Sequence, residues 1–145
     1  MTPLHVFRPE AQSGTYSAEF IGDNTLVSGH HKTLRVWEAA TGKLMQSIQA
    51  HAGIIWHLLR HNDTLYSAGN DNTVNAYHVQ TWDKLHTLSV PDHACRLFIH
   101  DDVLYVGVFR VGVHAFDTGT GRALGLAAEH KDEIQGLFQL NCLCV

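Results

Sequence analysis

The sequence has few basic residues and no long hydrophobic run, and these two shortages exclude several classes of function. Its 145 residues include 10 Lys or Arg against 14 Asp or Glu, which gives a net charge of -4 with His neutral. A surface that binds nucleic acid or anionic lipid needs clustered basic residues, so we expect no nucleic acid and no membrane as partner. No apolar run approaches the ~18 residues of a membrane-spanning helix.

Cysteine is also scarce, and a secretory signal is missing. Cys95, Cys142 and Cys144 are an odd number at no spacing typical of a disulfide framework. The N-terminal residues lack the basic segment followed by an apolar one that a secretory signal needs. A reduced intracellular chain explains both features most simply, so we expect a cytoplasmic or nuclear location.

Helical periodicity is the third absence. No segment keeps apolar residues at the i, i+3, i+4, i+7 spacing over a useful length. A short helix competes with a strand only over residues 124–138. The apolar fraction of 45% still provides for one domain with a hydrophobic core, and we expect strands to build it.

What the sequence does contain is a hairpin pattern that occurs three times. Residues 64–77 read Thr-Leu-Tyr-Ser-Ala-Gly-Asn-Asp-Asn-Thr-Val-Asn-Ala-Tyr, two strand-forming runs around a turn-forming centre. Residues 25–37 and 103–116 repeat this pattern, and 40 residues separate Trp37 from Tyr77. A fixed period of this size predicts repeated supersecondary units.

Each repeat contains four short apolar segments separated by turn residues. The predicted units are residues 15–50, 51–90 and 91–128, with an extended lead-in over 1–14 and the start of a fourth unit over 129–145. The expected strands cover residues 15–21, 26–28, 33–37, 44–48, 54–59, 84–90, 95–99, 122–126 and 134–140, together with the hairpins 64–77 and 103–116. Four antiparallel strands per ~40 residues is the composition of a β-propeller blade.

These residues resemble the WD-repeat family. The similarity rests on the segment from Leu65 to Tyr77 preceded by Ala50-His51, and on Leu-Val-Ser-Gly-His-His-Lys-Thr-Leu-Arg-Val-Trp-Glu with the following Thr-Gly-Lys-Leu. It implies an all-β fold, a partial WD-repeat-like β-propeller of four-stranded antiparallel blades. At ~40 residues per blade the chain holds about 3.5 blades, and closed propellers take ~4–8, so these are not enough to close alone. We therefore expect a fragment or subunit of a larger propeller, completed by additional blades or by an oligomer.

The resemblance also implies a polar network that locks each blade. In the family, a His before the innermost strand, a hydroxyl of the second strand, an Asp of the hairpin turn and a Trp of the third strand are linked, which pairs all of these buried groups. The positions that match are His51, Ser67, Asp71 and Tyr77 in the second unit, where a phenol replaces the indole, and Ser28 and Trp37 in the first. His31 stands at the Asp position of the first unit, and we expect the third unit to lack the network.

A catalytic or metal site is the alternative use of the same side chains. His51, Ser67 and Asp71 are the residue types of a hydrolase triad, but their order and spacing match the blade lock, and no Gly-x-Ser-x-Gly elbow is present. His30 and His31 are adjacent on a predicted strand, so their rings point to opposite faces. We expect no enzyme, no metal and no cofactor, and a hydrolase or metal-binding enzyme is the less favoured alternative.

The loop face is what remains for function, because WD-like propellers dock their partners there. The repeat places Ile54, Trp56, His30, Asn70, Phe109 and Arg110 on this face. Trp and Arg are frequent interface hot spots, although packing between blades is an equal use for the indole. We expect a non-catalytic protein–protein interaction scaffold that binds a protein or peptide. The short turns at 62–63 and 101–102 suggest an alternative, a substrate-recognition segment of a ubiquitin-ligase-type multidomain protein.

Overall fold

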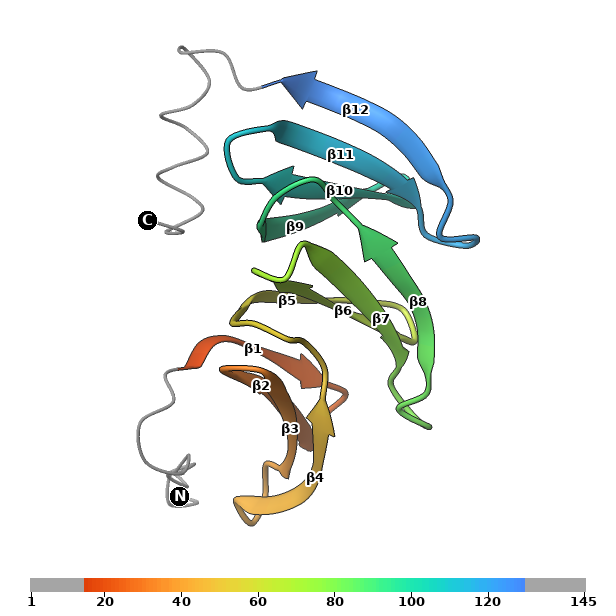
Figure 1. Cartoon of the computed structure of the whole chain (residues 1–145). Coiled ribbons are helices and arrows are strands. Elements are labelled where there is room, and N and C mark those ends of the chain that lie inside the picture. The colour runs from red at the N-terminus through yellow and green to blue at the C-terminus, as the bar shows by residue number, and fades with distance from the viewer. Residues whose placement is uncertain (1–14, 130–145) are drawn as a thin grey trace.

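The structure is a computed structural model that describes residues 15–129, and every regular element in this range is a β-strand (Figure 1). The first sheet contains β1 (Thr15–Ile21), β2 (Thr25–His30), β3 (Thr33–Glu38) and β4 (Lys43–Gln49). The second contains β5 (Ile55–His61), β6 (Thr64–Gly69), β7 (Thr73–His78) and β8 (Lys84–Ser89). The third contains β9 (Ala94–His100), β10 (Val103–Val108), β11 (Gly112–Asp117) and β12 (Ala123–Glu129).

Each sheet is an antiparallel meander, and the three sheets fan out as an open arc (Figure 1). The strands pair in chain order within every sheet, so each repeat folds as one blade. Strand β5 contacts both β1 and β9 along the inner side of the arc, and β4, β8 and β12 form the outer edges. The predicted all-β partial propeller is therefore confirmed.

The β6–β7 hairpin shows why the sequence adopts this register. Asn72 takes a positive φ of 66° in the turn, a conformation that Asn tolerates better than most residues. Pairing of Leu65 with Tyr77 and of Tyr66 with Ala76 then places alternate residues on opposite faces. Both faces are apolar because the middle sheet is covered on both sides.

Two hydrophobic cores hold the arc together, one on each side of the middle sheet. The core toward the first sheet is formed by Val27, Leu34, Val36, Ala50, Ile55, Leu58, Leu65, Tyr77 and Val79. The core toward the third sheet is formed by Tyr66, Ala68, Val74, Ala76, Leu88, Val90, Ala94, Leu97, Leu104, Val106, Val108 and Phe116. Full burial of one large apolar side chain contributes ~1.5–3 kcal/mol, so these cores dominate the stability of the arc.

The predicted strands agree with the observed ones to within a few residues at their ends. Strand β5 begins at Ile55 rather than Ile54. Strand β12 extends to Glu129, so the start of the segment 124–138, for which a short helix was the alternative, is a strand. The predicted lead-in over 1–14 and the strand over 134–140 lie outside the described residues. Within residues 15–129 there is no helix long and apolar enough to span a membrane.

Candidate functional site

The middle blade contains the predicted lock between His51, Ser67 and Asp71. The Nδ1 atom of His51 donates to Asp71 Oδ1 at 2.9 Å, and Ser67 Oγ lies 2.8 Å from its Nε2 atom. A carboxylate only accepts hydrogen bonds, so the Nδ1 atom carries a proton and donates it to Asp71. Asp71 also accepts from the Ala52 N–H at 2.9 Å and the Thr73 hydroxyl at 2.7 Å. This network ties the loop before β5 to the β6–β7 turn.

Asp71 is held in its charged form. Burial alone raises the pKa of Asp71, but the hydrogen bonds from Thr73, Ala52 and His51 outweigh it and the pKa lies below its ordinary value. The side chain of His51 is fully buried and that of Asp71 is 16% exposed. The pair therefore acts as a structural clamp.

The fourth member of the predicted lock, Tyr77, is not connected to it. The Tyr77 hydroxyl is buried and forms no well-aligned hydrogen bond within the described residues. Burial raises the pKa of Tyr77, and the neighbouring Asn75 side chain opposes this shift. Asn75 approaches the lock instead. Its Nδ2 atom lies 3.5 Å from His51 Nε2 and donates to the Ala50 carbonyl at 2.6 Å, while its Oδ1 atom accepts from Thr87 at 3.0 Å. The phenol serves as an apolar core group.

The first blade carries a lock of different composition, and this corrects the prediction for His30. His30 is 5% exposed and lies inside the sheet, not on the loop face. The Trp37 indole donates to Ser28 Oγ at 2.8 Å, and Ser28 Oγ lies 2.7 Å from His30 Nε2. The other ring nitrogen lies 3.1 Å from Thr15 Oγ1. His30 and Thr15 thus replace the loop His and the turn Asp of the family pattern.

Burial explains why His30 accepts this role. Desolvation and the nearby Arg35 charge lower the pKa of His30, so the ring stays neutral and its Nε2 atom accepts a hydrogen bond from the Ser28 hydroxyl. His31 is exposed and has a φ of 52°, so it forms the hairpin turn rather than the lock. Sequence reasoning missed this substitution because it aligned the network by position. The signal was an adjacent His pair beside Ser28 in a hairpin shortened by one residue.

A cluster of aromatic side chains lies on the loop face where the inner strands meet. Trp56 and Phe109 both pack against Cys95, and the rings of Tyr16 and Trp56 are 4.8 Å apart. Trp56 is half-buried, and its indole N–H is buried without a hydrogen bond among the described residues. The indole therefore packs between inner strands, while Phe109 and Tyr16 leave part of their surface open.

Arg110 extends this cluster with a positive charge. Its guanidinium lies 5.2 Å from the Phe109 ring centre and 3.1 Å from Asp92 Oδ2, and its side chain is 67% exposed. His93 stacks on Phe109 at 6.1 Å and donates from Nδ1 to the Asn70 carbonyl at 2.7 Å. We name Trp56, Phe109 and Arg110 the recognition patch.

The other residues predicted for the loop face connect neighbouring loops. Ile54 is half-buried, and its carbonyl accepts the Asn70 N–H at 3.0 Å. The Asn70 side chain lies so close to Gly53 that a Cβ there would be 1.7 Å from its Oδ1. His93 joins the Asn70 carbonyl of the neighbouring blade, so this His bonds to no Ser–Asp pair of its own blade. Ile54 and Asn70 thus connect the loops that lie beside the patch.

Sequence reasoning also missed His57, which joins two inner strands. Its Nδ1 accepts the Leu97 N–H at 3.0 Å, although 40 residues separate the two. Burial and the Arg96 charge lower the pKa of His57 to about 4, so the ring is neutral at physiological pH. Nothing in the sequence distinguishes this His from the other eleven.

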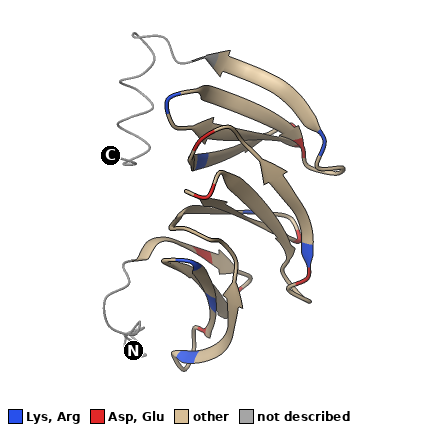
Figure 2. Ribbon diagram, in the orientation of Figure 1, with Lys and Arg blue, Asp and Glu red and all other residues tan. Residues whose placement is uncertain are grey.

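The geometry gives no support to the catalytic alternative. Ser67 has no exposed surface and His51 is 3% exposed, so a substrate cannot reach a Ser67 nucleophile in this arrangement. Over residues 15–129 no three His, Cys, Asp or Glu side chains are grouped closely enough to hold a metal. Acidic and basic residues are dispersed over the strands and turns of all three sheets (Figure 2).

The fold has clear structural neighbours. No protein-family model and no curated protein matches the sequence. The designed Ika4 protein superposes with a TM-score of 0.75 and 24% identity, covering 82% of this chain and 75% of its own. The RRP9 WD40 repeats give 0.76 and 15%, covering 83% and 40%, and Saccharomyces cerevisiae Sqt1 gives 0.74 and 13%, covering 81% and 36%.

These neighbours define the class of fold. The described chain is a partial WD40-like propeller, as the repeats predict. It spans about two fifths of the length of the natural WD40 structures that it matches.

Proposed function

We propose that this chain is a non-catalytic interaction scaffold that binds a protein or peptide through the recognition patch. One observation carries the proposal: Trp56 and Phe109 pack on one buried residue of the loop face, beside the exposed guanidinium of Arg110. Aromatic and Arg side chains supply most of the binding energy at protein interfaces. The buried polar side chains of the first and second blades already bond to one another in the blade locks. Binding of a partner therefore depends on side chains at the surface.

The patch favours a partner segment with an apolar side chain next to an acidic one. An apolar group can pack on the open side of Phe109, and a carboxylate can reach the N–H groups of Arg110 that Asp92 leaves unused. Asp92 holds Arg110 over the ring, which limits the side-chain entropy lost on binding. The role in a ubiquitin-ligase-type assembly stays a hypothesis that rests on the short turns alone.

Affinity capture from an extract of cells that express the protein tests this proposal. The wild type is compared with Phe109→Ala, Arg110→Ala and the matched control Lys43→Ala, whose side chain is exposed at the start of β4. We expect the two patch variants to recover the partner at least fivefold less, since hot-spot truncations cost ~1–2 kcal/mol or more, and the control to match the wild type. Equal recovery by all four proteins, or no partner for the wild type, contradicts the proposal.

We also propose that a second copy of this chain completes the ring. Phe20 lies on the face of the first sheet that points away from the middle sheet and is 57% exposed. Phe98 lies on the corresponding outer face of the third sheet and is 47% exposed. Both end sheets thus offer an apolar face of the kind that the middle sheet buries on each side. Light scattering is expected to give twice the monomer mass. A monomeric particle contradicts closure by a second copy.

A further inference from the structure

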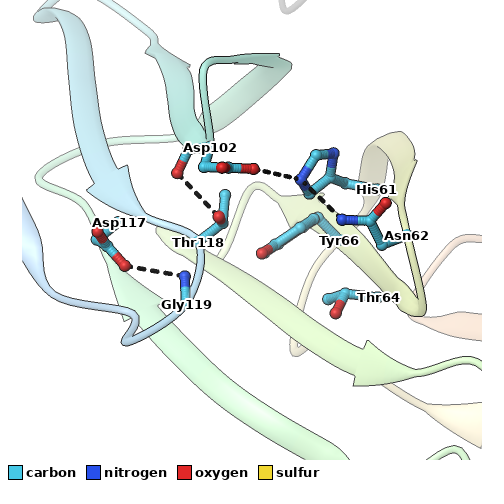
Figure 3. Close-up of a pocket in the computed structure, with 8 residues that line it drawn as sticks. All are labelled: His61, Asn62, Thr64, Tyr66, Asp102, Asp117, Thr118 and Gly119. Carbon is cyan, nitrogen blue, oxygen red and sulfur yellow. Dashed lines mark hydrogen bonds and ion pairs between the residues drawn. The ribbon is translucent and has the colours of Figure 1, made fainter.

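A hollow lies between the second and third sheets, on the face opposite the recognition patch. It is formed by the β5–β6, β9–β10 and β11–β12 turns and has a volume of about 370 Å³ (Figure 3). Its walls carry two carboxylates, from Asp102 and Asp117, together with hydroxyl and amide groups. No Lys or Arg is among the residues that line it.

Each carboxylate keeps one oxygen available to a ligand. Asp117 Oδ1 accepts from Gly119 N–H at 2.9 Å and from Thr120 N–H at 2.9 Å, while Oδ2 has no hydrogen bond within the described residues. Those hydrogen bonds, led by that of Thr120, hold the pKa of Asp117 below its ordinary value. Asp102 uses Oδ1 for His61 Nε2 at 3.2 Å, and its second oxygen is likewise unpaired in residues 15–129.

Tyr66 supplies an independent sign that this hollow is a binding site. The residue is 2% exposed, and its side chain points into the hollow (Figure 3). Its hydroxyl has no hydrogen-bond partner within residues 15–129 and is open to the hollow, where a ligand can reach it. Burial and the charge of Asp117 raise the pKa of Tyr66, so the hydroxyl keeps its proton at neutral pH.

Two arginines lie near the hollow without filling it. Arg60 donates from Nε to the Asn62 carbonyl at 3.0 Å on the rim, and Arg122 interacts with Asp117 through its charge. Neither lines the hollow, so the interior keeps its acidic character. A metal ion is a poor fit, because the described residues contain no group of three potential ligands.

We propose that this hollow binds a cationic side chain, a guanidinium or an ammonium group, from a partner protein. The unpaired oxygens of Asp102 and Asp117 accept its N–H groups, and the Tyr66 oxygen provides a third acceptor inside the hollow. The lining selects against anions by charge and against apolar groups by its exposed polar atoms. This site is separate from the recognition patch and does not depend on the function proposed for it.

An NMR titration of the ¹⁵N-labelled full chain tests this site. The probes are acetyl-Gly-Arg-Gly-amide, acetyl-Gly-Lys-Gly-amide and the matched neutral peptide with citrulline in place of Arg. We expect the Arg or Lys peptide to shift the amides of Asn62, Thr118 and Gly119 saturably, and citrulline to bind at least tenfold more weakly. Raising the salt concentration is expected to weaken the cationic peptides, since an exposed ion pair is screened.

Variants separate this site from general attraction to an acidic protein. Asp117→Asn keeps the oxygen that the turn uses and is expected to weaken binding about fivefold, the upper range for an exposed ion pair. Tyr66→Phe is expected to weaken binding about threefold without loss of stability, because the hydroxyl has no partner to lose. Arg122→Ala strengthens binding, and Asp101→Asn, outside the lining, leaves it unchanged. Equal shifts with citrulline, or unchanged affinity in both Asp117→Asn and Tyr66→Phe, overturn the proposal.

Discussion

Replacing Asp71 with Asn is expected to lower the free energy of unfolding by about 2 kcal/mol, because it leaves one buried donor of the middle lock without an acceptor. Asp71 accepts from His51 Nδ1 and from the Ala52 N–H, each at 2.9 Å, and from the Thr73 hydroxyl at 2.7 Å. An Asn side chain keeps one acceptor oxygen and turns an NH₂ group toward one of these donors.

The loss is expected to depend on pH in a defined direction. The folded-state pKa of Asp71 lies below its unfolded value of 3.8, so the carboxylate contributes its full stability above pH ~5. This contribution disappears as the pH falls through the lowered pKa. The difference between wild type and Asp71→Asn is therefore constant near neutrality and shrinks in acid.

Urea denaturation followed by circular dichroism at several pH values measures this difference. The matched control is Asp101→Asn, whose carboxylate is 88% exposed and pairs only with the exposed His100 among the described residues. That substitution is expected to cost less than ~0.5 kcal/mol. An Asp71→Asn variant as stable as the control, or a difference that grows in acid, refutes the structural role of the lock.

Three further predictions follow from the same contacts. His30→Ala is expected to cost about 2 kcal/mol in urea denaturation, against less than ~0.5 kcal/mol for the exposed His31→Ala, and equal losses contradict the first-blade lock. Gly69→Ala places a Cβ 2.5 Å from His51 Nδ1 and is expected to cost 2 kcal/mol or more, on the order of other overpacking changes. Gly119→Ala has only a 3.3 Å contact and serves as its control; a harmless Gly69→Ala contradicts the packing. His57 is expected to titrate near pH 4 by NMR, with stability lost as the pH falls from ~6.5 toward 4, and a value near 6.5 contradicts its burial.

The sequence predicts the sheets well because strand pairing within a blade is local. The strands of a blade follow one another in the chain, so alternation and turn residues are enough to place β6 and β7. The middle lock is also predictable, because His51, Ser67 and Asp71 keep the family spacing. Tyr77 shows the limit: matching its position did not reveal that its hydroxyl leaves the network and that Asn75 approaches the lock instead.

Features that combine side chains of different strands, within one blade or between two blades, are not visible in the sequence. His30 changes from a surface residue to a lock residue because the pairing of β1 with β2 brings Thr15 opposite it. The acidic hollow joins His61 to Asp102, 41 residues further along the chain. Each of these side chains has an ordinary turn or strand context of its own, and only the packing of sheets defines the site.

Site-specific photocrosslinking from the loop face tests the central claim, binding through the recognition patch, most directly. A benzophenone side chain replaces Phe109, and a matched probe replaces the exposed Thr120 on the opposite face. We expect the first probe to form a covalent adduct with a partner protein that unlabelled wild type competes away and Arg110→Ala abolishes, and the second probe to form no such adduct. No adduct at position 109, or the same adducts from both positions, contradicts a recognition role for this face.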